Sequence, residues 1–124
     1  MQVNKDILSY LDQIIASTQT DTIDWQKANP TTFVWTIKKP SEAKITIQFV
    51  RKTLLTNTGV RKIKRYILEA TDPTNSTPRF SITGDDNNRE LFDKLETLFN
   101  AINESFTRKG LYFLKSILPV QERE

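Results

Sequence analysis

The C-terminal third of the chain, between Asn88 and Leu118, carries a long run of apolar residues with helical spacing. They recur at steps of three and four, which places them along one broad stripe of a helix. The stripe consists of Leu91, Phe92, Leu95, Leu98, Phe99, Ile102, Phe106, Phe113, Leu114, Ile117 and Leu118. Because so wide an apolar stripe must be covered by another layer, it constrains what the rest of the chain can form.

Individual residues predict where this helix begins, where it is interrupted and where it ends. Asn87, with Glu90 three residues later, predicts a cap at the start of the helix. Gly110 interrupts the pattern, and glycine weakens a helix interior. We therefore expect a break or bend at Gly110, followed by a second helix over 111–118 that Pro119 ends.

Helical spacing also occurs near the N-terminus and predicts a first helix over residues 5–16. Its apolar residues are Val3, Ile7, Leu8, Leu11, Ile14 and Ile15. The polar segment that follows ends at Asn29-Pro30 and has room for one helical turn over 24–27. We expect Trp25 to fill the gap between this helix and a sheet.

From Thr31 the apolar period changes to two, which is typical of strands with one buried face. Two alternating sets predict the first two strands: Phe33, Trp35 and Ile37, then Ile45, Ile47 and Phe49. A third strand, over about 60–70, follows the Asn57-Thr58-Gly59 connector. It has apolar residues on both faces, which indicates either a bulge near Lys64-Arg65 or a strand buried on both sides at its far end. A short fourth strand carries Phe80 and Ile82.

Short connections between these strands favour an antiparallel meander over a parallel sheet. The sequence thus predicts an α+β fold: an N-terminal helix, a four-stranded antiparallel meander and a long C-terminal helix, packed as a two-layer sandwich. With 124 residues, we expect a single domain over 1–124 whose core needs no disulfide.

The chain contains neither cysteine nor histidine, which excludes thiolate nucleophiles, histidine-based triads and the commonest metal ligands. Its three glycines stand singly, so there is no phosphate-binding loop. The side chains that remain for acid–base chemistry are carboxylates, lysines and tyrosines. The grouped carboxylates are Asp12, Asp21 and Asp24, and the Asp85-Asp86 pair. We interpret the first three as solvated and the pair as helix-capping residues. We therefore expect no enzymatic activity, cofactor or metal, with a carboxylate-dependent enzyme as the more remote alternative.

Positive charge is concentrated between Thr31 and Ala70, where nine Lys and Arg residues meet two acids, whereas the remainder has nine bases and thirteen acids. We expect Lys38, Lys44 and Lys52 on the open face of the sheet, with Lys62 and Lys64 beside them. Such a face is suited to a nucleic-acid backbone, with Tyr66 as a stacking platform. The full candidate set is Lys38, Lys44, Arg51, Lys52, Arg61, Lys62, Lys64, Arg65 and Tyr66. A plainer interpretation, which we favour, is a solvated face whose lysines prevent pairing with other chains.

The stretch Trp25-Gln26-Lys27-Ala28-Asn29-Pro30-Thr31-Thr32-Phe33-Val34-Trp35, followed by three strands and a long helix, resembles small uncharacterised bacterial domains. The order of four strands and a helix is also similar to the positive-cofactor-four coactivator and the Whirly single-strand DNA binders. This similarity covers roughly half of the chain, and the N-terminal helix departs from it. It implies single-stranded nucleic acid as one class of ligand.

Beyond the predicted core, the C-terminal segment carries a surplus of apolar residues, among them Tyr112 and Val120. Such a surplus favours a homodimer or docking on another protein. Residues 1–15 lack the pattern of a secretory signal, and the apolar runs are too short to span a membrane. We expect a cytoplasmic, non-catalytic interaction module that associates with itself or with an unknown protein. Single-stranded nucleic-acid binding through the basic sheet face is the alternative.

Overall fold

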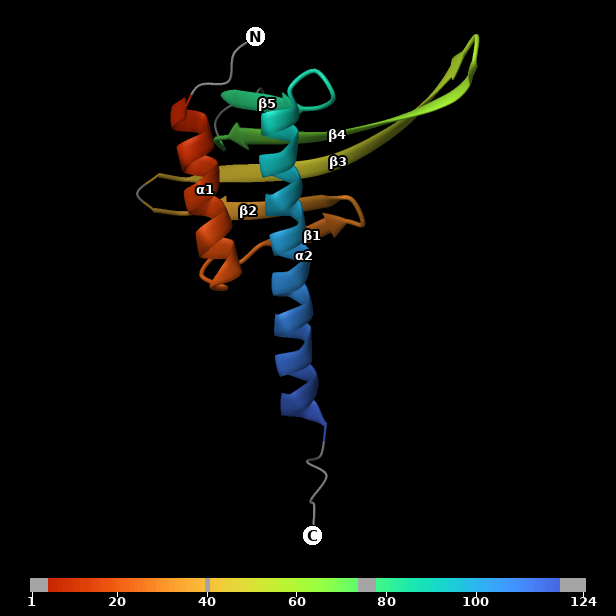
Figure 1. Cartoon of the computed structure of the whole chain (residues 1–124). Helices are drawn as coiled ribbons and strands as arrows, with labels where there is room; N and C mark the ends of the chain where they lie inside the picture. The colour runs from red at the N-terminus through yellow and green to blue at the C-terminus, as the bar shows by residue number, and fades with distance from the viewer. Residues whose placement is uncertain (1–4, 40, 74–77, 119–124) are drawn as a thin grey trace.

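A computed structural model describes residues 5–39, 41–73 and 78–118 of the chain. The elements in order are α1 (Lys5–Gln19), β1 (Gln26–Asn29), β2 (Thr32–Ile37), β3 (Ala43–Thr56), β4 (Gly59–Thr71), β5 (Phe80–Gly84) and α2 (Arg89–Ile117). All strands belong to one antiparallel sheet in the order β1-β2-β3-β4-β5, and both helices lie on the same side of it (Figure 1). The α+β class and the antiparallel sheet are confirmed, but the sheet has five strands where the sequence predicted four.

The core lies between the helices and the facing side of β2, β3 and β4. Phe33 and Ile47, which are register partners on β2 and β3, are 0% exposed, as are Leu98 and Ile102 of α2. Aromatic rings fill the centre: the ring of Phe99 lies 5.2 Å from Phe33. The first half of the predicted stripe is thus the domain core, as its width required.

β5 and α2 approach each other closely at Gly84. A Cβ placed on Gly84 would lie 2.7 Å from the Cα of Phe92, a separation that real Cβ atoms do not adopt. Glycine at this position therefore lets the start of α2 rest directly on the end of β5.

β1 replaces the helical turn expected over 24–27. All of its residues are exposed, so the strand has no apolar alternation that would reveal it in the sequence. The Asn29 side chain accepts hydrogen bonds from the backbone N–H of Thr31 at 3.0 Å and from its hydroxyl at 3.1 Å, which closes the turn into β2. β1 is therefore defined by this turn and by its pairing with β2.

Trp25 fills the gap between α1 and the sheet, as expected. It is 3% exposed, and its ring lies 5.8 Å from that of Trp35. Its indole Nε1 donates to the Thr18 hydroxyl at 3.0 Å, which in turn donates to the Ile14 carbonyl at 2.8 Å. These bonds accompany the extension of α1 to Gln19, three residues beyond the predicted end.

β3 and β4 pair without a bulge, from Lys44 opposite Thr71 to Thr56 opposite Gly59. The second explanation of the third predicted strand is therefore correct: Tyr66 and Leu68 face the helices, while Ile67 lies on the other face. Gly59, at φ 135°, follows the turn and has a conformation that favours glycine.

α2 is continuous from Arg89 to Ile117, so the break predicted at Gly110 is wrong. One glycine costs a helix about 1 kcal/mol, which good helix formers on both sides offset. The predicted stop at Pro119 and the apolar positions Val3 and Val120 lie outside the described residues.

The cap expected from Asn87 is also wrong, because the capping position is Asn88, whose side chain makes no capping hydrogen bond. Instead, the Asp85 carboxylate accepts the Asn87 N–H at 2.9 Å and its carbonyl accepts the Asn88 N–H at 3.0 Å. Asp86 forms ion pairs with Arg61 and Arg89. The acidic pair thus shapes the turn before α2 without capping its first turn.

Candidate interaction surfaces

Two elements project from the body of the fold in different directions (Figure 1). One is the last part of α2, residues 107–118, which we call the helix tail. The other is the end of the β3–β4 hairpin, residues 50–65, which we call the hairpin arm. β2 pairs with β3 only as far as Gln48, and β5 pairs with β4 only from Tyr66, so the strands of the arm are paired only with each other.

The helix tail exposes the second half of the apolar stripe. Its large apolar side chains are Leu111 (56% exposed), Tyr112 (71%), Phe113 (62%), Leu114 (47%), Ile117 (55%) and Leu118 (57%). Among the residues that the structure describes, none covers these side chains. The expected surplus of apolar residues is therefore present at the surface.

Gly110 lies within this stripe, because it precedes Phe113 and Leu114 by three and four residues and so shares their side of the helix. Tyr112, two residues further on, points to a different side. A Cβ placed on Gly110 would meet no atom within 4 Å. No packing contact within the described chain therefore requires glycine here.

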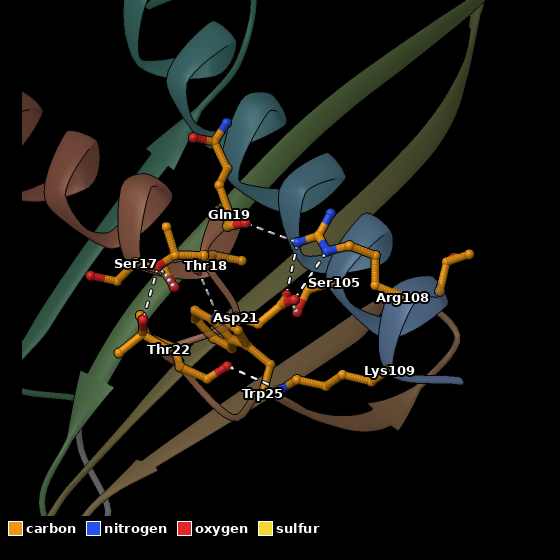
Figure 2. A network of polar contacts seen from close by, with 12 residues as sticks. Ser17, Thr18, Gln19, Asp21, Thr22, Trp25, Ser105, Arg108 and Lys109 are labelled. Atoms are coloured by element: carbon orange, nitrogen blue, oxygen red, sulfur yellow. Dashed lines mark hydrogen bonds and ion pairs between the residues drawn. The ribbon is translucent and has the colours of Figure 1, made fainter. Parts of the chain in front are cut away.

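A group of polar contacts fastens α2 to the α1–β1 loop where the helix tail begins (Figure 2). Asp21 accepts hydrogen bonds from the Ser105 hydroxyl at 2.6 Å and from Arg108 Nη2 and Nε at 2.8 and 3.1 Å. The same Nη2 donates to the Gln19 carbonyl at 3.1 Å, and Lys109 Nζ donates to the Ile23 carbonyl at 3.3 Å. We call this group the loop clamp.

The acids that were candidates for catalysis form ion pairs in or near the loop clamp. The hydrogen bonds from Arg108 and then Ser105 lower the pKa of Asp21 from 3.8 to about 2, and the bond to Asp21 raises the pKa of Arg108 above its ordinary value. Asp24 pairs with Lys109 at 3.4 Å, and Asp12 pairs with Lys94. All three acids are thus ion-paired with cations of α2. Asp12 and Asp24 are also more than half exposed, as the interpretation of solvated acids expected, whereas Asp21 is partly buried.

The predicted basic residues do not form one surface on the sheet. Lys38 follows β2 and Lys44 lies near the start of β3, at the end of the sheet opposite to the arm. Lys52 lies on the same face of the hairpin as Lys44, but Lys62 and Lys64 pair with Thr53 and Arg51 and so lie on the other face. The expectation that Lys62 and Lys64 join the open face is therefore wrong.

Tyr66 lies in the core and is not a stacking platform. It is 5% exposed, and its ring lies 5.3 Å from Phe92 and 5.4 Å from Phe99. Burial, together with the negative charge of Glu96, raises the pKa of Tyr66 to about 12. The strand is apolar on both faces, so alternation alone did not indicate which face of it was inside.

The hairpin arm gathers most of the remaining basic candidates. Six cations lie on it: Arg51, Lys52, Arg61, Lys62, Lys64 and Arg65. No acid occurs between Glu42 and Glu69 in the sequence. The charge is evident in the sequence, but the continuation of β3 and β4 past the sheet is not, because residues 51–56 show no clean alternation.

A pocket of about 260 Å³ lies at the other end of the sheet, near Lys44, Glu42 and Asp72. Asp72 forms an ion pair with Arg79. Over the described ranges, no group of three or more acids is arranged to hold a metal ion. The structure therefore provides no new support for a carboxylate-dependent reaction.

Comparisons of the chain with protein-family models, curated proteins and solved structures found no match. Within residues 5–39, 41–73 and 78–118, neither helix combines the length and the apolar character that crossing a membrane requires.

Proposed function

We propose that the protein is a self-associating interaction module whose helix tail docks on the tail of a second copy. The observation that carries this proposal is the exposed stripe of large apolar side chains on a helix that extends past its own sheet (Figure 1). Exposed apolar clusters of this kind mark interaction surfaces. In a two-fold symmetric contact the two copies of one stripe cover each other, so no second surface is needed.

The presence of glycine at position 110 favours a second helix as the element that packs on the exposed stripe. Glycine in a helix interior costs about 1 kcal/mol relative to alanine, and nothing within 4 Å of the missing Cβ offsets that cost inside the chain. A glycine on a contact face lets the backbones of two helices approach closely. We place the crossing point of the two tails at Gly110.

The charges beside the stripe favour an antiparallel crossing of two identical helices. Glu104 and Lys115 are both exposed, and their separation of about three helical turns places them along one edge of α2. They lie six residues before and five residues after Gly110. A two-fold axis at Gly110 therefore brings each Glu104 opposite Lys115 of the second copy, twice in each dimer.

The proposal is tested by measuring the mass of the full chain by sedimentation equilibrium over a concentration series. We expect the mass to rise from 14.4 kDa toward twice that value. Leu114→Glu places a charge in the stripe and should keep the chain monomeric. The matched control is Leu55→Glu, because Leu55 is 87% exposed but lies at the tip of the hairpin arm. A wild-type mass of one chain at every concentration, or equal loss of association in both variants, would overturn the proposal.

A charge exchange tests the antiparallel arrangement. Lys115→Glu should weaken association, because it replaces the cation opposite Glu104 of the second copy with another carboxylate. Adding Glu104→Lys should restore association by exchanging the partners of each pair. If the double variant associates no better than Lys115→Glu alone, the two tails do not cross in this orientation.

A further inference from the structure

The hairpin arm is a second projecting element whose chemistry differs from that of the helix tail. We infer that it is a binding element for double-stranded nucleic acid, inserted as a two-stranded ribbon between two rows of phosphates. This inference rests on the arm alone and does not depend on self-association through the helix tail.

The division of charge between the two faces of the arm carries the inference. The β3–β4 register places Arg51, Lys62 and Lys64 on the face that continues the helix side of the sheet. It places Lys52, Arg61 and Arg65 on the opposite face. A flat acidic protein surface would meet one of these faces and leave three cations unused. In a duplex groove, phosphates border the ribbon on both sides, so both sets are matched.

The dimensions of the arm also fit a groove. From Arg51 to Thr56 the strands extend about 17 Å at the usual rise per residue of an extended chain. The major groove of a duplex is about 12 Å wide and admits a two-stranded ribbon. Among the described residues no other strand pairs with the arm, so both of its edges and both of its faces can enter such a groove.

Five of the six cations of the arm are exposed and available to a ligand, and Arg65 is partly buried. Arg61 pairs with Asp86 at 3.4 Å, but both side chains are more than half exposed, so this pair contributes little and is readily exchanged. The cations lie on either side of an apolar tip formed by Leu54 (41% exposed), Leu55 (87%) and Val60 (62%).

The test is a fluorescence-anisotropy titration of a labelled DNA duplex with the full-length protein over a salt series. We expect affinity to fall steeply as salt rises, because each phosphate contact releases counterions. Lys62→Ala with Lys64→Ala neutralises one face of the arm, and Lys52→Ala with Arg61→Ala neutralises the other. Each pair should weaken binding and reduce the slope of log affinity against log salt by about two.

The control is Lys38→Ala with Lys44→Ala, which removes the same charge at the opposite end of the sheet and should leave both the affinity and the slope unchanged. Loss of binding in this control, or in only one of the two arm pairs, would overturn the inference. So would tighter binding to a single strand of the same sequence. Binding to anionic phospholipid vesicles without binding to the duplex would likewise contradict it and assign the arm to a membrane surface.

Discussion

The two halves of α2 share one apolar stripe but differ in what covers it. In the first half, Leu95, Leu98 and Ile102 are 0% exposed beneath the sheet and α1, whereas Leu114 and Ile117 in the second half are about half exposed. Both halves belong to a single unbroken helix. Helical periodicity therefore predicts that a stripe will be covered. The width of the sheet across its strands decides how much of the stripe this chain can cover itself.

The largest expected difference between the two halves is in the effect of Leu98→Ala and of Leu114→Ala on the free energy of unfolding. Removing the buried Leu98 side chain leaves a cavity in the core, and we expect the free energy of unfolding to fall by about 2–5 kcal/mol. In dilute protein, Leu114→Ala should change it by less than about 0.5 kcal/mol, since its side chain is a surface group there. Urea denaturation at low protein concentration measures both. Similar losses for the two variants would mean that the helix tail is covered within one chain.

Gly110→Ala sharpens the comparison at the point where the two halves meet. Because a Cβ at this position meets nothing within 4 Å, alanine should raise the free energy of unfolding of the monomer by about 1 kcal/mol. The same methyl group should weaken self-association, because it separates the crossing helices. Urea denaturation of dilute protein and sedimentation of concentrated protein give the two results separately. If Gly110→Ala increased both the free energy of unfolding and self-association, the two helices would not cross closely at Gly110.

Asp21→Asn tests the loop clamp that holds the start of the helix tail, and its effect should be the smallest of the three. Asparagine tolerates the positive φ of 59° at this position, so the substitution removes the charge and one of the two accepting oxygens without straining the backbone. The pKa of Asp21 is lowered from 3.8 to about 2, so the carboxylate contributes stability above about pH 4 and loses that contribution as pH falls toward 2.

Thermal denaturation across this pH range should therefore show wild type more stable than Asp21→Asn at pH 6, with the gap closing as pH approaches 2. Ser105→Ala is a useful companion, because it removes one hydrogen bond to Asp21 and keeps the ion pair with Arg108. A gap that is the same at pH 6 and pH 2 would show that the Asp21 charge does not stabilise the fold.

Much of the fold could be predicted from the sequence, because its signals are local. The first half of the stripe, the alternation of Phe33 and Trp35, and the position of Trp25 all correspond to the structure. β1 could not be predicted, since its residues are all exposed and it depends on pairing with β2. Tyr66 was misplaced for a related reason: a strand that is apolar on both faces does not indicate which face the helices will cover.

The candidate surfaces were predicted only in part. The apolar surplus at Leu111 to Leu118 was visible because its spacing continues that of the core. The arrangement of the cations was not, because the face that each lysine occupies depends on the β3–β4 register, and a shift of one residue exchanges the two faces. The composition of the arm was thus readable in the sequence, whereas its shape required the structure.

Hydrogen exchange of the α2 backbone amides, followed by mass spectrometry at a low and a high protein concentration, shows directly whether a second copy covers the helix tail. Amides in 91–106 should be protected equally at both concentrations, because the sheet and α1 of the same chain cover that half. Amides in 111–118 should exchange quickly in dilute protein and become protected as concentration rises, since a second copy covers the helix tail. Exchange in 111–118 that does not depend on concentration would contradict the claim that the tail is an intermolecular surface.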